Sequence, residues 1–267
     1  MSHRRKRFKS SKSLVFACFL LFALLVAGGV YYWSNLELIL KGDYARAEDL
    51  QEEGEYEKAL HIFENLGKRH PNFELADKAL FNTGEILNFD LQRYHEAILA
   101  YLTVEKNYPD SPMVVRALQR VAAIYKNRLR DYPRAIISFQ KILDQGVVQG
   151  DRMQYEVADC YFRLNNFEQA RIEFESLLKS YPETAFSAEV QYRVAVSSSL
   201  EGDLGKALSA FKLVIEKWPE SPYALEARFG LAGVLEEREE LTAALAELKR
   251  LKKIYPNPEV LEKRISQ

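Results

Sequence analysis

The 267-residue sequence has few of the residues from which catalytic or covalently stabilised sites are built. It contains only two cysteines, Cys18 and Cys160, which excludes a disulfide scaffold and a four-thiolate zinc site. None of its four histidines is paired with a second ligand at metal-binding spacing, and it has no glycine-rich phosphate loop or nucleophile elbow. The sequence therefore predicts no catalytic, metal or cofactor site, no small-molecule substrate and no enzymatic activity.

An excess of one charge sign is also missing, since 37 Lys and Arg residues face 38 Asp and Glu residues. This balance argues against nucleic acid as a partner. The charges are nevertheless segregated, because residues 1–33 hold six basic side chains and no acidic one. The rest of the chain is left with 31 basic against 38 acidic residues and is acidic overall.

Leu14 to Trp33 is an uncharged and almost wholly apolar run. A helix of about 20 residues spans roughly 30 Å, the thickness of the hydrocarbon core of a bilayer. The run ends in three aromatic residues, which suit the membrane interface, and the basic cluster precedes it. The positive-inside rule then predicts a cytoplasmic tail over 1–13, a single-pass anchor helix over 14–33 and a chain that continues outside the cytoplasm.

Two other interpretations of this run compete with an uncleaved anchor. A cleaved signal peptide would use Val26-Ala27-Gly28 or Ala27-Gly28-Gly29 as a weak cleavage site. A lipoprotein signal would use Cys18, although only four apolar residues precede that cysteine. The length of the run and its terminal rings favour the anchor.

Beyond the apolar run, an alanine followed four residues later by a large ring or a leucine recurs six times, at intervals of 38, 38, 35, 37 and 37 residues. These signature pairs are Ala59/Phe63, Ala97/Tyr101, Ala135/Phe139, Ala170/Phe174, Ala207/Phe211 and Ala244/Leu248. A small residue stands twelve or thirteen positions before each alanine, and a proline stands twelve positions after five of them. This joint register indicates six copies of one structural unit.

Each copy predicts a pair of helices joined by a short turn. Apolar residues from Tyr56 to Leu66 recur at helical spacing and form one apolar face, and the small residue in the preceding helix lets the two backbones approach closely. Gly54, Asn165 and Gly202 occupy turn positions typical of left-handed residues, and the proline stops the second helix. Because one hairpin cannot bury both of its faces, we expect the copies to stack.

The small–Ala–aromatic–Pro pattern over residues 42–256 resembles the tetratricopeptide repeat family. The resemblance implies an all-α fold, a right-handed superhelical solenoid of about six hairpins over 43–256, preceded by a linker over 34–42. The third copy carries residues 146–150, with two glycines, where its proline should be. This segment suggests either a joint between copies 1–3 and 4–6 or a simple loop variation. Residues 257–267 are expected to cap the last hairpin.

The connectors 108–112, 181–184 and 218–223 resemble those of bacterial envelope repeat proteins, which include the lipoprotein BamD, the Tol-Pal-associated YbgF family and the inner-membrane YfgM family. A single N-terminal span with an outward repeat domain is closest to the YfgM arrangement. The resemblance implies a bacterial inner-membrane scaffold with a periplasmic repeat domain, serving envelope protein assembly or secretion. The alternative is a secreted or lipid-anchored structural subunit of an outer-membrane or pilus-assembly complex.

In this family the first helix of each hairpin lines a concave groove. The position three residues before the small residue is aromatic in five of the six copies: Tyr44, Phe81, Tyr155, Tyr192 and Phe229. Basic residues near this aromatic stripe are Arg116, Lys126, Arg152 and Arg163. These side chains are the candidate binding site for a protein or peptide partner, since rings bury much area at low entropic cost. The competing interpretation is that the rings pack as core between hairpins.

Overall fold

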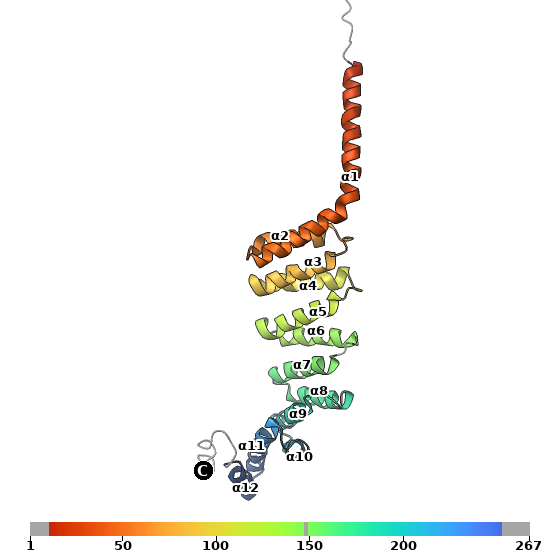
Figure 1. Cartoon of the computed structure of the whole chain (residues 1–267). Helices are drawn as coiled ribbons and strands as arrows, with labels where there is room; N and C mark the ends of the chain where they lie inside the picture. Colours follow the sequence, from red (N-terminus) through yellow and green to blue (C-terminus); the bar gives the residue numbers. More distant parts are fainter. Residues whose placement is uncertain (1–10, 147–148, 253–267) are drawn as a thin grey trace, which may run out of the picture. The chain divides into compact units, whose positions relative to one another are not determined.

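The computed structural model describes residues 11–146 and 149–252, and every regular element in these ranges is helical. In chain order the elements are α1 (Ser11–Glu52), α2 (Tyr56–Arg69), α3 (Ala76–Glu85), the π-helix η1 (Ile86–Asp90), α4 (Tyr94–Asn107), α5 (Met113–Ala123), the π-helix η2 (Ile124–Leu129), α6 (Tyr132–Asp144), α7 (Gly150–Arg163), α8 (Phe167–Ser180), α9 (Ser187–Glu201), α10 (Leu204–Lys217), α11 (Pro222–Glu237) and α12 (Leu241–Leu251). Figure 1 shows their succession along the chain.

The helices form two compact units that divide between Met113 and Val114. In the first unit α1 packs on α2, α2 on α3 and α3 on α4. In the second unit each helix from α6 to α12 packs on the next one along the chain. Packing of consecutive helices is the organisation of a helical repeat solenoid, and the all-α fold class predicted from the sequence is confirmed.

Helices α6 and α7, which flank the glycine-rich segment, pack against each other within the second unit, and the joint or loop variation expected at 146–150 stays a prediction. Packing explains Gly150, since a Cβ atom there would lie 2.2 Å from the Tyr181 hydroxyl oxygen. Gly146 has φ +64°, a conformation that favours glycine. Residues 1–10 of the expected tail and the expected cap over 257–267 lie outside the described residues.

In each hairpin the small residue of the first helix and the signature pair of the second helix belong to the buried core. All six signature alanines and their partners are buried. The small residues Ala47, Gly84, Ala122, Ala158, Ala195 and Ala232 lie in the first helices, and the five alanines among them are fully buried. At Gly84 the contact is direct, since an added Cβ would lie 2.5 Å from Cε1 of the Tyr101 ring. The positions that the sequence pattern assigns to the small residue, the alanine and the ring are therefore buried core positions.

Six residues with positive φ end the first helices, and each stands five positions before a signature alanine. They are Gly54, Gln92, Arg130, Asn165, Gly202 and Glu239. The three turn residues predicted from the sequence are confirmed, whereas Gln92, Arg130 and Glu239 carried no such signal. In four of the turns the next backbone N–H bonds the carbonyl five residues back, as Glu55 does to Leu50 at 2.8 Å, which satisfies a carbonyl left free at the helix end.

The two π-helices account for an irregularity in the sequence spacing. The small residue precedes its alanine by thirteen positions at Gly84 and Ala122 and by twelve elsewhere. These are the two copies in which the first helix ends in η1 or η2. A π-turn holds one extra residue per turn of helix, so the inserted residue is accommodated without displacing the hairpin seam. The N–H of Arg93 accordingly bonds Leu87 at 2.7 Å, six residues back.

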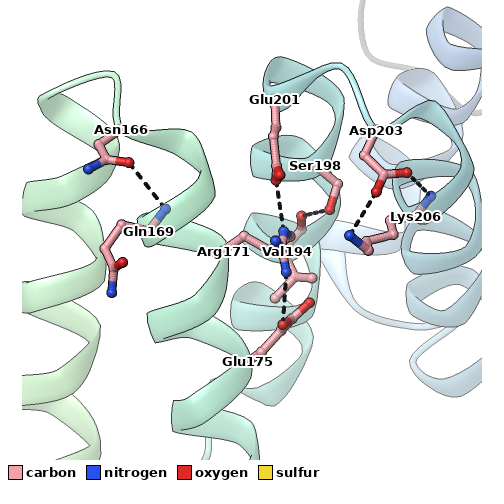
Figure 2. A network of polar contacts seen from close by, with 9 residues as sticks. All are labelled: Asn166, Gln169, Arg171, Glu175, Val194, Ser198, Glu201, Asp203 and Lys206. Atoms are coloured by element: carbon pink, nitrogen blue, oxygen red, sulfur yellow. Dashed lines mark hydrogen bonds and ion pairs between the residues drawn. The ribbon is translucent and has the colours of Figure 1, made fainter.

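Side chains and prolines define where the second helices begin and end. The Asn166 amide oxygen and an Asp203 carboxylate oxygen accept hydrogen bonds from the backbone N–H groups of Gln169 and Lys206, at 3.2 and 2.9 Å respectively (Figure 2). At their C-terminal ends α2, α4, α8 and α10 are each followed by one residue outside the helical conformation, with ψ between 58° and 68°, and then by proline, which confirms the proline as the stop signal.

Helix α1 extends without interruption from the apolar run into the first hairpin, and Figure 1 shows its N-terminal part projecting away from α2 and α3. Its C-terminal part carries Leu40, Tyr44 and Ala47 into the core. Residues 34–42, the expected linker, are helical. By length and composition α1 could cross a membrane, and its apolar window is not buried against the rest of the described chain.

Two glycine substitutions test the seam. We expect Gly84→Ala to lower the stability of the repeats by about 1–3 kcal/mol, because the new methyl group would overlap the buried Tyr101 ring. Gly205→Ala is the control, since its Cβ would meet only the Asp203 carboxylate at 3.6 Å. We expect that change to be neutral or to stabilise α10 by up to about 1 kcal/mol. Equal melting temperatures for both variants would contradict the seam.

Candidate protein-binding surface

The rings of the predicted aromatic stripe all lie on the first helices, but most of their area is used inside the hairpins. Tyr44 and Phe81 are buried, while Tyr155, Tyr192 and Phe229 are partly exposed. Four of the five pack on the signature ring of their own hairpin, with centroid distances of 5.3–6.0 Å: Tyr44–Phe63, Phe81–Tyr101, Tyr155–Phe174 and Tyr192–Phe211. The structure thus gives these rings a core contact and leaves only parts of the last three accessible.

Tyrosine hydroxyls of the stripe also link consecutive first helices. The Tyr44 hydroxyl accepts a hydrogen bond from the Asn82 side chain at 3.0 Å, which joins α1 to α3. The Tyr155 hydroxyl donates to Glu189 at 2.5 Å, which joins α7 to α9. Burial, followed by this hydrogen bond, raises the pKa of Tyr155 well above its usual value, so the phenol stays protonated and donating.

The predicted basic residues divide into two groups. Lys126 is 9% exposed on η2 and forms ion pairs with Glu156 and with Asp159, the latter at 2.5 Å. Arg163 donates to the same Asp159 at 2.8 Å. Burial alone would raise the pKa of Asp159, but the hydrogen bonds from Lys126 and Arg163 outweigh it and lower that pKa. Lys126 is therefore engaged between neighbouring hairpins of the second unit.

Arg116 on α5 and Arg152 on α7 are exposed. A further arginine that the sequence did not single out, Arg171 on α8, is largely buried and pairs with Glu201 at 2.8 Å and Glu175 at 3.1 Å (Figure 2). Like Lys126, this arginine ties one hairpin to the next. Lys126 and Arg171 are thus buried ion-pair partners that connect neighbouring hairpins of the second unit.

A cavity of about 240 Å³ lies between the first helices α9 and α11, which contact each other directly. Tyr192, Val196, Ser199 and Leu200 contribute from α9, and Glu226, Phe229, Gly230, Gly233, Val234 and Glu237 contribute from α11, with Phe211 beneath. The α11 residues recur at helical spacing, so they share one face. We call this feature the α9–α11 groove.

Glycine opens this groove. A Cβ at Gly230 would lie 2.5 Å from Cζ of the Phe211 ring, so only glycine lets the ring and the helix approach this closely. Leu200 at the rim is 52% exposed. Glu226 and Glu237 are exposed and have no ion-pair partner among the described residues. The groove therefore combines apolar walls with carboxylates that are free to meet a partner of opposite charge.

The repeats are matched by three family models, each described as a tetratricopeptide repeat, over residues 44–112, 153–184 and 200–264. The chain belongs to the tetratricopeptide repeat family. The stretch between the first two matches contains the copy that lacks its proline. Family membership confirms the resemblance inferred from the sequence; the narrower envelope type stays a prediction.

Solved tetratricopeptide repeat structures share the fold over most of the chain. YrrB, described as having an unusual peptide-binding site, matches with a TM-score of 0.56 and 17% identity over 77% of this chain and 100% of its own. PilW, a type IV pilus biogenesis factor, matches with a TM-score of 0.52 and 17% identity over 85% of this chain and 98% of its own. A tetratricopeptide repeat protein from Parabacteroides merdae ATCC 43184 matches with a TM-score of 0.52 and 14% identity over 85% of this chain and 97% of its own. No curated protein matches the sequence significantly.

The role of Lys126 in this tetratricopeptide repeat domain is testable by removing its charge. We expect Lys126→Met to lower stability by about 3 kcal/mol, because Asp159 would keep only Arg163 and Glu156 would lose this partner. Lys206→Met is the control, since its pair with Asp203 is exposed and contributes about 0–1 kcal/mol. Thermal unfolding compares the two. An unchanged melting temperature for Lys126→Met would contradict a structural role for the Lys126 ion pairs.

Proposed function

We propose that the chain is a membrane-anchored tetratricopeptide repeat scaffold of the bacterial inner membrane, whose repeat domain faces the periplasm and binds a protein or peptide partner. Envelope protein assembly or secretion is the process it would serve. The observation that carries the proposal is the continuity of α1, whose exposed apolar segment leads directly into the core of the first hairpin.

The apolar segment of α1 needs an apolar surrounding that the described chain does not supply. Its large side chains between Phe16 and Trp33 are exposed, with Trp33 at 75%. Exposing so many contiguous apolar residues to water is strongly unfavourable, while a bilayer would cover them along the roughly 30 Å of its hydrocarbon core. The basic residues before the segment support an N-terminus in the cytoplasm and a repeat domain outside it.

The α9–α11 groove is the surface that we propose for the partner. Its volume of about 240 Å³ suits one or two side chains of a docked segment, and its rim carries Leu200, Glu226 and Glu237. Tyr155, Tyr192, Phe229, Arg116 and Arg152 are proposed to extend the contact, whereas Tyr44, Phe81 and Lys126 are buried. A partner with apolar and basic side chains would complement this surface.

The alternative function is a secreted or lipid-anchored subunit of an outer-membrane or pilus-assembly complex. PilW, a type IV pilus biogenesis factor, has a similar fold, and pilus assembly is therefore one process that this alternative includes. Cleavage near Ala27 would leave the packed part of α1 intact, since Leu40, Tyr44 and Ala47 follow the cleavage site. The fate of the N-terminal segment therefore separates the two functions.

The anchor is tested on the full chain expressed in a bacterial host. We expect an intact mass that retains residues 14–33, resistance to alkaline carbonate extraction, and activity of alkaline phosphatase fused to the C-terminus, because that enzyme is active only outside the cytoplasm. A shortened, carbonate-soluble chain would favour the alternative. A fusion that is inactive as phosphatase but fluorescent as a cytoplasmic reporter would contradict the topology.

The groove is tested by charge reversal at its rim. We expect Glu226→Lys combined with Glu237→Lys to reduce cross-linking of the partner in membranes at least about tenfold, since a close charge contact contributes more than 1.4 kcal/mol. The matched control reverses Glu216 and Glu220, which are exposed and do not line the groove. Quantitative cross-linking and a melting curve are measured for each. Equal capture by both double variants would place the partner elsewhere.

A further inference from the structure

A second cavity, of about 220 Å³, lies within the first unit, where α1 meets the segment that follows α2. We call it the juxtamembrane pocket. Trp33, Glu37 and Leu40 contribute from α1, and Arg69, His70 and Phe73 contribute from the end of α2 and the segment after it. Leu40 and Phe73 are buried and form the apolar base, while Trp33 stands exposed at the other end.

The basic side chains of this pocket are available to a ligand. Arg69 is exposed and His70 is half-buried, and neither side chain has a hydrogen-bond or ion-pair partner within residues 11–146 and 149–252. Glu37 also lines the pocket, but the Lys41 ammonium group lies 3.7 Å from its carboxylate and 2.6 Å from that of Glu74. The carboxylate is thus partly neutralised, and Arg69 is the accessible charge at the mouth.

The position of the pocket along α1 places it beside the lipid headgroups once α1 spans the bilayer. Trp33 ends the apolar run, and the seven helical steps from Trp33 to Leu40 rise by about 10 Å. The polar headgroup layer of one leaflet is roughly 5–8 Å thick. The pocket therefore begins at the hydrocarbon boundary and extends through the headgroup layer.

We propose that the juxtamembrane pocket binds the headgroup of a membrane phospholipid, with Arg69 on the phosphate, His70 as a second donor and Trp33 against the glycerol and upper acyl chain. A guanidinium group forms short, charge-assisted hydrogen bonds to phosphate, and an indole suits the boundary between apolar and wet surroundings. This inference rests on the proposed membrane anchoring. Headgroup binding would attach the first hairpin directly to the membrane surface, in addition to its attachment through the membrane-spanning part of α1.

A structural explanation for Arg69 has to be separated from lipid binding. Arg69 lies in the last turn of α2, where a cation also stabilises the helix dipole. Lys68 shares that turn, is exposed, and pairs with Glu64 at 3.1 Å without lining the pocket. Lys68→Gln is therefore the matched control for Arg69→Gln.

The experiment uses the full chain in detergent micelles with Trp218→Phe, which leaves Trp33 as the single tryptophan and a reporter in the pocket wall. Phosphatidylglycerol, diacylglycerol with the same acyl chains, and sodium phosphate are titrated separately. We expect a saturable change in Trp33 emission with phosphatidylglycerol and none with the other two at equal concentrations. Arg69→Gln should weaken the apparent affinity about tenfold, and Lys68→Gln should leave it unchanged.

Three outcomes would overturn lipid binding. These are an equal response to diacylglycerol, an equal response to sodium phosphate, which would make the pocket a site for free anions, and an unchanged affinity in Arg69→Gln with unchanged helix content by circular dichroism. Failure of the anchor is detected independently, by reconstituting the same single-tryptophan chain in vesicles of phosphatidylcholine with brominated acyl chains. Quenching of Trp33 there shows insertion whether or not the pocket binds a headgroup.

Discussion

The close approach of a small residue to a ring is the constraint on which the rest of the fold depends. Where Gly84 meets Tyr101, the ring lies so close to the glycine backbone that even a Cβ atom would overlap it. Each such pair fixes the two helices of one hairpin but leaves the outer faces of both helices apolar. Neighbouring hairpins must cover those faces, so a single local contact, repeated along the chain, leads to stacking.

The sequence predicted this contact because spacing alone encodes it. Ala170 and Phe174 lie one helical turn apart, and the same pair recurs in register six times. The turns were only half predictable, since Gly202 and Asn165 favour positive φ whereas Glu239, in the same conformation, does not. Around Glu239 the turn is held by the hydrogen bond from the Glu240 N–H to the Leu235 carbonyl at 2.8 Å. The π-turns were not predicted, because a spacing of thirteen rather than twelve residues does not specify the backbone conformation that accommodates it.

The candidate binding site was less predictable for a physical reason. A ring on a first helix can face its own hairpin or the groove, and the same residue types serve both purposes. Tyr155 does both in part, since its ring packs on Phe174 while its hydroxyl bonds Glu189 on the next first helix. Lys126 carries a charge that the sequence assigns to the surface, yet two acidic partners hold it inside. The α9–α11 groove depends on how near Phe211 comes to Gly230, which is a three-dimensional property.

The continuity of α1 changes what an anchor does in the proposed function. A flexible linker would raise the local concentration of the repeats near a membrane while leaving their orientation free. A helix that leads directly into the first hairpin, as the packing of Leu40 and Tyr44 requires, transmits the orientation of the anchor to that hairpin. A headgroup held by Arg69 would add a second point of attachment on the other side of the juxtamembrane pocket. Two points of attachment restrict rotation about α1 where one does not, so the lipid contact would reduce the orientations of the first hairpin that a partner has to accommodate.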